Sequence, residues 1–346
     1  MTSIKWSNYP LLAQSTNATI WLQIQADLRL AQNTVDAYGR ALEDFFRICR
    51  HLAVSPEHAK REHIAAYVQE LSQRQLAHRK DHQSPIGLAN ATLQQRLTAV
   101  RLFFDHLVEE DIRRDNPVGR GRYVAGKGFG TSERGLIPRY RKLPWIPNDD
   151  EWCLILVAAQ AEPLRNRLML AFSYDAALRR EELCSLTTAD IDPSQRLLRI
   201  RAETTKNGWE RVVPYLSETN KLLTVYLRQR KLLSRQSGPL FLSESRRNHA
   251  QPLSIWSWSK IIRRLAERTG LSRFTTHTTR HLCLTDLARA GWDIHEIARF
   301  AGHRSIQTTL NYIHLSGREL AAKLEASMSS VHAWRVRQIS EVSIEA

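Results

Sequence analysis

Residues 275–314 read TTHTTRHLCLTDLARAGWDIHEIARFAGHRSIQTTLNYIH, and this stretch decides the fold that we predict. Its apolar residues repeat at helical spacing over 282–290, and Gly291 follows as a typical helix-ending residue. A second short helix is predicted over 294–301, closed by Gly302. The pattern therefore predicts short helices joined by glycine turns, which can bring polar groups at the helix ends together.

Four polar residues of this stretch suit phosphate chemistry when they act together. His277 and Arg280 are three positions apart and share a helix face, His303 lies in a glycine turn, and Tyr312 ends a third helix. A tyrosine can act as a nucleophile when a base assists it, a guanidinium can bind phosphate through two hydrogen bonds, and histidine transfers protons near neutral pH. Each residue alone has an ordinary structural explanation, so the prediction depends on the joint spacing. His277 and His281 could form a metal pair, but the glutamate of H-E-x-x-H is missing, which argues against a metal site.

The phrases HTTRH, LARAG, AGHRS and TLNYIH together resemble the C-terminal signature of the tyrosine recombinases, the family of phage integrases and Xer-type resolvases. In that family an H-x-x-R helix precedes a G-H turn, and the nucleophilic tyrosine follows about nine residues later. Tyr312 follows His303 at that interval.

Composition indicates the kind of partner. The chain has 346 residues and a formal net charge of +15, which predicts a polyanionic partner, most simply double-stranded DNA. The longest apolar run, over 153–159, is too short to span a membrane, and the N-terminus lacks a signal-peptide core, so we expect a cytoplasmic, nucleoid-associated bacterial protein. The four cysteines are expected to be reduced core residues without zinc; they are Cys49, Cys153, Cys184 and Cys283.

The N-terminal part is predicted to consist of an irregular extension over 1–15 and a helical domain over 16–118. Apolar residues recur at helical spacing in four segments of this domain. The phrases NTVDAYGRALEDFF and TLQQRLTAVRLFFDHLVEEDIRRDNPV are similar to the first and last helices of the recombinase core-binding (SAM-like) domain. The resemblance implies that this domain forms one half of a clamp around DNA.

A basic linker is predicted over 119–147. The overlapping stretch from 113 to 142 contains nine Lys or Arg residues and two Asp or Glu residues. It is either a solvated loop or a segment along the DNA backbone, and the second interpretation is favoured. Its candidate DNA contacts are Arg120, Arg122, Lys127, Arg139, Arg141 and Lys142.

The C-terminal domain is predicted over 148–346. The phrase AALRREELCSLTTADID resembles the family's first arginine motif, G-L-R-x-x-E-L-x-x-L-x-x-x-D-I. The resemblance assigns the catalytic arginine to Arg179, with Arg180 as the rival, and the supporting acid to Glu182. It also implies that Asp190 opens a sheet. Ala177 stands where the family usually has Gly, and we expect it to tighten the backbone slightly.

A hairpin is predicted over 197–215, with Asn207-Gly208 as a type I′ turn. Lys206 at its tip would ordinarily be a solvated charge, but the resemblance implies a lysine that reaches the scissile phosphate through the minor groove. The tail over 318–330 is expected to form an oligomerisation helix. It could pack on its own domain or on a neighbouring protomer, and the resemblance favours the neighbour.

The resemblance implies a mainly α fold with a small β-sheet and a site-specific DNA recombinase or integrase. Such an enzyme cuts and rejoins DNA through a 3′-phosphotyrosine and a Holliday junction, without metal or cofactor. Tyr312 would be the nucleophile, assisted by Arg179, Lys206, His277, Arg280 and His303.

The implied assembly is a homotetramer on paired DNA sites, with an accessory DNA-bending or directionality protein as a further candidate partner. Integration, excision or transposition of a mobile element is the favoured role, while the sequence leaves phage integration, transposon movement, integron cassette exchange and chromosome dimer resolution open. Two alternative functions are a DNA-binding regulator of the same fold without activity and a type IB topoisomerase. A metal-dependent nuclease is disfavoured because the chain lacks a clustered set of Asp and Glu.

Overall fold

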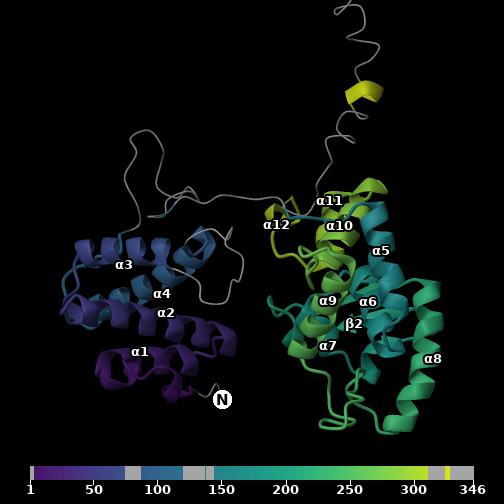
Figure 1. Cartoon of the computed structure of the whole chain (residues 1–346), viewed down its shortest axis with the longest axis horizontal. Coiled ribbons are helices and arrows are strands. Elements are labelled where there is room, and N and C mark those ends of the chain that lie inside the picture. Colours follow the sequence, from purple (N-terminus) through teal and green to yellow (C-terminus); the bar gives the residue numbers. More distant parts are fainter. Residues whose placement is uncertain (1–3, 75–86, 120–136, 138–143, 311–323, 328–346) are drawn as a thin grey trace, which may run out of the picture. The chain divides into compact units, whose positions relative to one another are not determined.

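The computed structural model describes residues 4–74, 87–119, 137, 144–310 and 324–327 (Figure 1). The chain divides into two compact units, Met1–Arg141 and Lys142–Ala346. Within the described parts, no helix is both long and apolar enough to cross a membrane. The predicted mainly helical fold with a small sheet is confirmed.

The N-terminal unit is a helical bundle. Its helices are α1 (Thr16–Asp27), α2 (Gln32–His51), α3 (Arg61–Gln73) and α4 (Asn90–Glu109), with short 3₁₀ turns at Trp6–Asn8, Leu12–Gln14 and Pro56–His58. Helices α2 and α4 pack through aromatic rings, among them the edge-to-face pair of Phe45 and Phe104, whose ring centroids are 5.9 Å apart. The aromatic positions predicted from helical spacing therefore form the core of this unit.

Residues 4–15, which the sequence placed in an irregular N-terminal extension, contain two short 3₁₀ turns and pack against the helical bundle. Tyr9 and Leu12 are fully buried in the core of the helical unit. The carboxylate of Glu43 on α2 accepts hydrogen bonds from the backbone N–H groups of Leu11 and Leu12, at 3.0 Å each. Because a buried carboxylate caps these N–H groups, this segment is fixed to the bundle.

The C-terminal unit surrounds a small antiparallel sheet with helices. The sheet has the order β1 (Ile191–Asp192), β2 (Leu197–Ile200) and β3 (Arg211–Pro214). The helices are α5 (Asp149–Gln160), α6 (Leu164–Asp175), α7 (Arg180–Cys184), α8 (Ser217–Leu233), α9 (Ile255–Thr269), α10 (Thr278–Arg289), α11 (Ile294–Ala301) and α12 (Ile306–Leu310). A 3₁₀ turn at Thr188–Asp190 leads into β1, as expected for Asp190.

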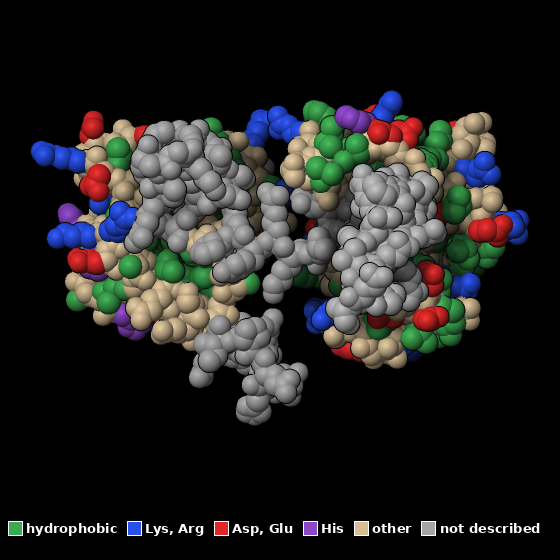
Figure 2. All heavy atoms as spheres, turned by 90° about the horizontal axis from the view of Figure 1, so that it is seen from above, with side chains coloured by type: hydrophobic (Ala, Val, Ile, Leu, Met, Phe, Trp, Pro, Cys, Tyr) green, Lys and Arg blue, Asp and Glu red, His purple; other side chains and the backbone are tan. Residues whose placement is uncertain are grey.

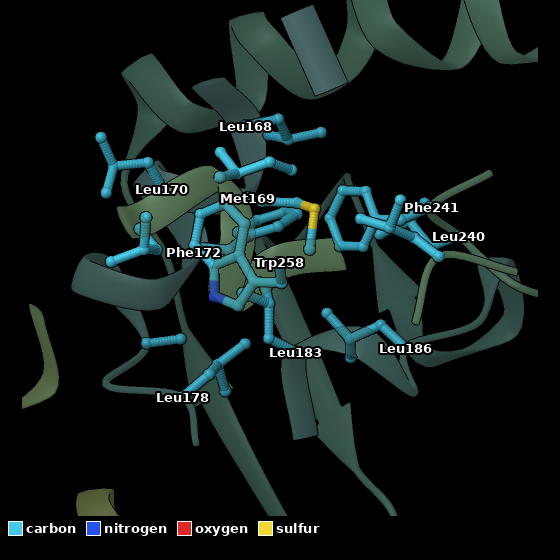
Figure 3. Packing of buried hydrophobic residues seen from close by; sticks show 14 of the residues in the cluster. Leu168, Met169, Leu170, Phe172, Leu178, Leu183, Leu186, Leu240, Phe241 and Trp258 are labelled. Atoms are coloured by element: carbon cyan, nitrogen blue, oxygen red, sulfur yellow. The ribbon is translucent and has the colours of Figure 1, made fainter. Parts of the chain in front are cut away.

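The core of this unit lies between α6, α9 and the sheet. Figure 3 shows Trp258 of α9 among Met169 and Phe172 of α6 and Leu183 of α7. Trp258 is almost completely buried, and Phe241 from the loop before α9 joins the same cluster. This packing fixes α7 against α9, and α7 begins directly after Arg179.

The connection between β2 and β3 differs from the predicted type I′ turn. The strands are paired with Leu198 opposite Val213, but residues 201–210 lie between them and include a 3₁₀ turn at Ala202–Thr204. Gly208 has φ +66°, whereas Asn207 is not among the residues with positive φ. A type I′ turn needs positive φ at both central positions, so that prediction was wrong. The Thr205 hydroxyl instead accepts from the backbone N–H of Trp209 at 3.0 Å and closes a wider loop.

Two smaller expectations also need correction. Cys49 and Cys283 are buried and Cys184 is partly buried, but Cys153 is exposed on α5, so it is not a core residue. Ala177 does more than tighten the backbone, because its φ of +46° lies in the left-handed region while its side chain is fully buried. An alanine in that region stores conformational strain of about 1–2 kcal/mol.

Candidate active site

Arg179 is held at the start of α7 by the carboxylate of Glu182. Its backbone N–H donates to Glu182 Oε2 at 2.9 Å, and its Nη1 donates to Glu182 Oε1 at 2.8 Å. Burial raises the pKa of Glu182, but the hydrogen bonds and charges of Arg211 and Arg179 outweigh burial and lower it to about 2. Glu182 is therefore a buried, permanently ionised group that orients Arg179.

Arg280 is almost fully buried on the first turn of α10. Its Nη1 donates to the carbonyl oxygen of Ala177, and its Nη2 donates to the carbonyl oxygen of Ala301 at 2.7 Å. The strained turn at Ala177 thus positions a carbonyl for Arg280 two residues before Arg179. The short segment 177–179 therefore binds Arg280 through a carbonyl and also carries Arg179.

His303 follows the glycine turn and binds Arg280. Its Nε2 lies 2.8 Å from Arg280 Nη2, and its Nδ1 lies 2.8 Å from the hydroxyl of Thr309. A guanidinium only donates, so Nε2 accepts and the proton lies on Nδ1. Burial, together with the charges of Arg280, Arg179 and Arg211, lowers the pKa of His303 to about 3. The imidazole is therefore neutral near pH 7.

The C-terminal end of α11 is where these side chains meet. Its last carbonyl groups have no partner within the helix and carry the negative end of the helix dipole. Arg280 binds the carbonyl of Ala301, while Arg179 Nη2 and Asn207 Nδ2 each donate to the carbonyl of Gly302 at 3.3 Å. Gly302 itself has φ +64°, which allows the turn that presents His303.

His277 lies at the N-cap of α10 and is exposed. Desolvation by the surrounding protein lowers its pKa, Glu181 opposes this shift, and the charges of Arg180, Arg280 and Arg179 lower the pKa further. The ring is thus within electrostatic range of the arginines and favours its neutral form.

The structure brings together Arg179, Glu182, Arg280 and His303. Lys206 is exposed in the β2–β3 loop, beside the Asn207 that reaches Gly302. Tyr312 lies outside the described residues. So do the linker candidates Arg120, Arg122, Lys127, Arg139, Arg141 and Lys142, and most of the predicted C-terminal helix.

The rival Arg180 points to different partners. Its Nη2 pairs with Glu181 at 2.6 Å, its Nη1 donates to Ser259 at 3.2 Å, and its guanidinium lies 5.8 Å from the ring centroid of the exposed Trp256. Because Arg179 instead contacts Glu182 and Gly302, the geometry favours Arg179 as the arginine of the site.

Sequence reasoning missed Arg211, the first residue of β3. Its guanidinium forms two hydrogen bonds with Glu182, and its Nε donates to the carbonyl of Phe300 at 3.1 Å. The available signal was an arginine in the phrase ERVVP, at an inward position of a predicted strand. A charged residue at such a position needs a buried partner.

A groove of about 920 Å³ lies beside this cluster, between β3 and α11. Its walls include Arg211, His303 and Arg299, with the partly exposed rings of Trp209 and Trp292.

Figure 2 shows Lys and Arg side chains projecting from the described surface of both units, with Asp and Glu between them. In the described parts of the chain, no three His, Cys, Asp or Glu side chains are grouped as a metal site would require.

Comparison with known proteins places this chain in one family. Residues 148–319 match the phage integrase family, and residues 21–111 match the phage integrase N-terminal SAM-like domain. The chain belongs to the tyrosine recombinase family of phage integrases and Xer proteins and is a site-specific tyrosine recombinase.

Among its relatives is tyrosine recombinase XerC of Pelotomaculum thermopropionicum, 30% identical, with 72% of this chain and 79% of the relative covered. Another is XerD of Caulobacter vibrioides, 29% identical, with 88% and 93% covered.

Solved structures share the fold. XerH bound to palindromic difH in a post-cleavage complex has a TM-score of 0.64 at 19% identity, with 85% of this chain and 79% of that chain covered. A lambda integrase dimer bound to a COC′ core site has a TM-score of 0.63 at 20% identity, with 88% and 96% covered.

Proposed function

We propose that this recombinase cuts and rejoins double-stranded DNA at a specific site through a 3′-phosphotyrosine on Tyr312 and a Holliday junction. The observation that carries the proposal is the convergence of Arg179, Arg280 and His303 at the end of α11. His303 lies three residues before the start of α12 and nine before Tyr312. The net charge of +15 and the DNA-bound XerH and lambda integrase structures support DNA as the substrate.

The two guanidinium groups would bind the non-bridging oxygens of one phosphodiester. Among the contacts of the described residues, Arg179 uses Nη1 on Glu182 and Nη2 on Gly302, so it is oriented by fixed partners before DNA arrives. A preorganised guanidinium stabilises the extra negative charge of the pentacoordinate transition state. His303 would position the phosphate together with Arg280.

The bond changes balance without any co-reactant. The Tyr312 hydroxyl attacks phosphorus and passes its proton to His277, whose lowered pKa leaves it neutral and able to accept. The bond from phosphorus to the 5′-oxygen breaks, and Lys206 gives that oxygen a proton. A 5′-hydroxyl of another strand can then reverse the step, since the tyrosyl ester conserves the energy of the phosphodiester.

The wider assembly is part of the same proposal. The linker side chains Arg120, Arg122, Lys127, Arg139, Arg141 and Lys142 would contact the DNA backbone. Four protomers would act on paired sites, with the C-terminal helix on a neighbouring protomer and an accessory protein setting direction. The chain would serve the integration, excision or transposition of a mobile element.

The test uses the full chain and a nicked suicide substrate built from DNA that the chain selects out of a random library. Tyr312→Phe should form no SDS-resistant covalent complex, whereas the unaltered chain should form one in the presence of EDTA. A covalent complex with Tyr312→Phe would show that the nucleophile is a different residue.

Arg179→Ala and Arg180→Ala form a matched pair of neighbours in that assay. We expect the first to lose cleavage by at least about 10³-fold with DNA binding kept, and the second to stay within about tenfold of the unaltered chain. The reverse result would transfer the assignment to Arg180.

A further inference from the structure

Arg211 is a buried cation that no role in strand cleavage yet explains. Its side chain is only 9% exposed. Nη1 donates to Glu182 Oε1 at 3.0 Å and Nη2 donates to Glu182 Oε2 at 2.8 Å, which is the parallel two-bond geometry of a strong arginine–carboxylate pair. Its Nε donates to the carbonyl of Phe300 at 3.1 Å. One side chain therefore joins β3, α7 and the end of α11.

The charges of this cluster show why the second arginine matters. Glu182 has a fully buried side chain and stays ionised, since its pKa lies near 2. It binds both Arg179 and Arg211, so one negative charge is shared by two positive charges. Without Arg211, the carboxylate would pair with Arg179 alone and cancel the charge that a phosphodiester requires.

The packing around Gly302 points to the same role. A Cβ atom on Gly302 would lie 2.9 Å from Arg211 Nη1 and 3.0 Å from Arg211 Cδ. The guanidinium thus fills the space beside the turn that presents His303, and both Arg211 and His303 line the groove between β3 and α11. Any movement of Arg211 would be transmitted to the turn that Arg179 and Arg280 also hold.

We propose that Arg211 is a positioning residue for DNA cleavage. It neutralises Glu182 and holds the 300–302 carbonyl turn, so that Arg179 keeps its orientation and its net charge for the scissile phosphate. The inference rests on the proposed function of Arg179 and Tyr312. It differs from simple stabilisation because it predicts that removing the charge of Glu182 compensates for the loss of Arg211.

The experiment compares four full-length variants with the unaltered chain: Arg211→Met, Arg211→Lys, the double variant Arg211→Met/Glu182→Gln, and the control Arg199→Met. Arg199 lies on the neighbouring strand β2 and pairs with Glu210 at 2.8 Å, but both side chains are exposed. Single-turnover formation of the covalent complex is measured at saturating suicide DNA, and the DNA Kd is measured separately. Thermal melts report folding.

We expect Arg211→Met to lower the cleavage rate by about 10²-fold while the DNA Kd changes less than about threefold. Arg211→Lys should regain part of the rate, because it restores the charge without the paired hydrogen bonds. The double variant should be at least about tenfold faster than Arg211→Met, and Arg199→Met should match the unaltered chain. If Arg211→Met unfolds at a clearly lower temperature than the unaltered chain, the cleavage rates of Arg211→Lys and of the double variant are compared with that of the unaltered chain instead.

Three results would overturn the inference. The first is an Arg211→Met rate within threefold of the unaltered chain. The second is a loss that appears wholly in the DNA Kd. The third is a double variant no faster than Arg211→Met, which indicates a purely structural pair. A Tyr312→Phe variant run in parallel separates the two proposals, because a covalent complex there rejects the proposed function, whereas full Arg211→Met activity beside an inactive Tyr312→Phe rejects only this inference.

Discussion

Asp44 in the N-terminal unit and Glu182 in the C-terminal unit are buried carboxylates that each bind at least two arginines, and the two sites differ in what those arginines contact next. Asp44 on α2 binds Arg74, whose Nη1 lies 2.9 Å from Oδ1, and also binds Arg96 of α4. Glu182 binds Arg179 and Arg211. In both sites guanidinium groups offset the cost of removing a carboxylate from water.

The onward contacts separate the two clusters. Arg74 also pairs with Glu70, one turn earlier on α3, at 2.5 Å, so the Asp44 cluster joins helices of one bundle. Arg179 and Arg211 instead donate to the carbonyl groups of Gly302 and Phe300 at the end of α11. The same ion-pair chemistry therefore joins helices of a bundle in one unit and orients the side chains of the proposed reaction site in the other.

The strongest test of this contrast removes each carboxylate in turn. Asp44→Ala should lower the stability of the N-terminal unit by about 3 kcal/mol, because it leaves two partly buried arginines without their carboxylate. Glu182→Ala should lower the cleavage rate by about 10²-fold at saturating DNA, because Arg179 loses its orienting partner. Hydrogen exchange of peptides from α2 and α7 measures the local stability, and covalent-complex formation measures the rate.

Asp44→Ala serves as the control for Glu182→Ala, and the reverse also holds. Below the unfolding temperature of the N-terminal unit, Asp44→Ala should cleave DNA at nearly the unaltered rate. A cleavage defect in Asp44→Ala as large as that in Glu182→Ala would remove the functional distinction between the clusters.

A second, smaller effect isolates the contact between Arg211 and the turn. Gly302 and Gly270 both end helices in the left-handed conformation, with φ +64° and +71°, but an added Cβ meets Arg211 only at Gly302 and open space at Gly270. Gly270→Ala should therefore cost only the backbone strain, about 1 kcal/mol. Gly302→Ala should cost about 1–2 kcal/mol more, because the guanidinium must move, and should also slow cleavage.

Thermal melts and the single-turnover assay on this pair measure the difference. Equal losses of stability with unchanged cleavage in both variants would mean that Arg211 yields without affecting the site. If Gly302→Ala lost no more stability than Gly270→Ala but cleaved DNA more slowly, the turn would be stable but misaligned.

The sequence predicted those parts of the site that short spacing encodes. Arg179 and Glu182 are three residues apart, and they do pair across the first turn of α7. Arg211 was missed because its partner is 29 residues away and no local period connects a four-residue strand to a short helix. Such a pairing depends on tertiary packing, which a local pattern does not contain.

The same reasoning explains the other differences. Tyr9 is buried against Gly39 because an aromatic ring finds a gap on α2, which the irregular N-terminal pattern could not indicate. Asn207-Gly208 fits a type I′ turn locally, but the Asn207 side chain binds the carbonyl of Gly302 and the loop follows that contact. The helical spacing of apolar residues predicted the cores of both units. The conformations of the loops depend on contacts with residues that are distant in the sequence, which local patterns do not contain.

The last and smallest effect concerns acid. The Glu182 cluster packs against His303, whose pKa is lowered to about 3, mainly by burial and then by Arg280, Arg179 and Arg211. Unfolded histidine has a pKa near 6.5, so the unfolded chain binds a proton there before the folded chain does. The stability due to this neutral ring is complete above about pH 6.5 and is lost progressively as the pH falls toward 3.

We therefore expect the stability of the C-terminal unit to fall by about 1–2 kcal/mol between pH 6.5 and pH 5 through this ring. His303→Gln keeps an acceptor for Arg280 without titrating, so it should be less stable at pH 7 but less sensitive to acid. Hydrogen exchange of α10 peptides, corrected for intrinsic rates, measures the difference, and His295→Gln on the exposed face of α11 is the control. If His303→Gln and the unaltered chain lost equal stability over this interval, the imidazole would not be held neutral by burial and the neighbouring arginines, and acid sensitivity would not distinguish the Glu182 cluster from the Asp44 cluster.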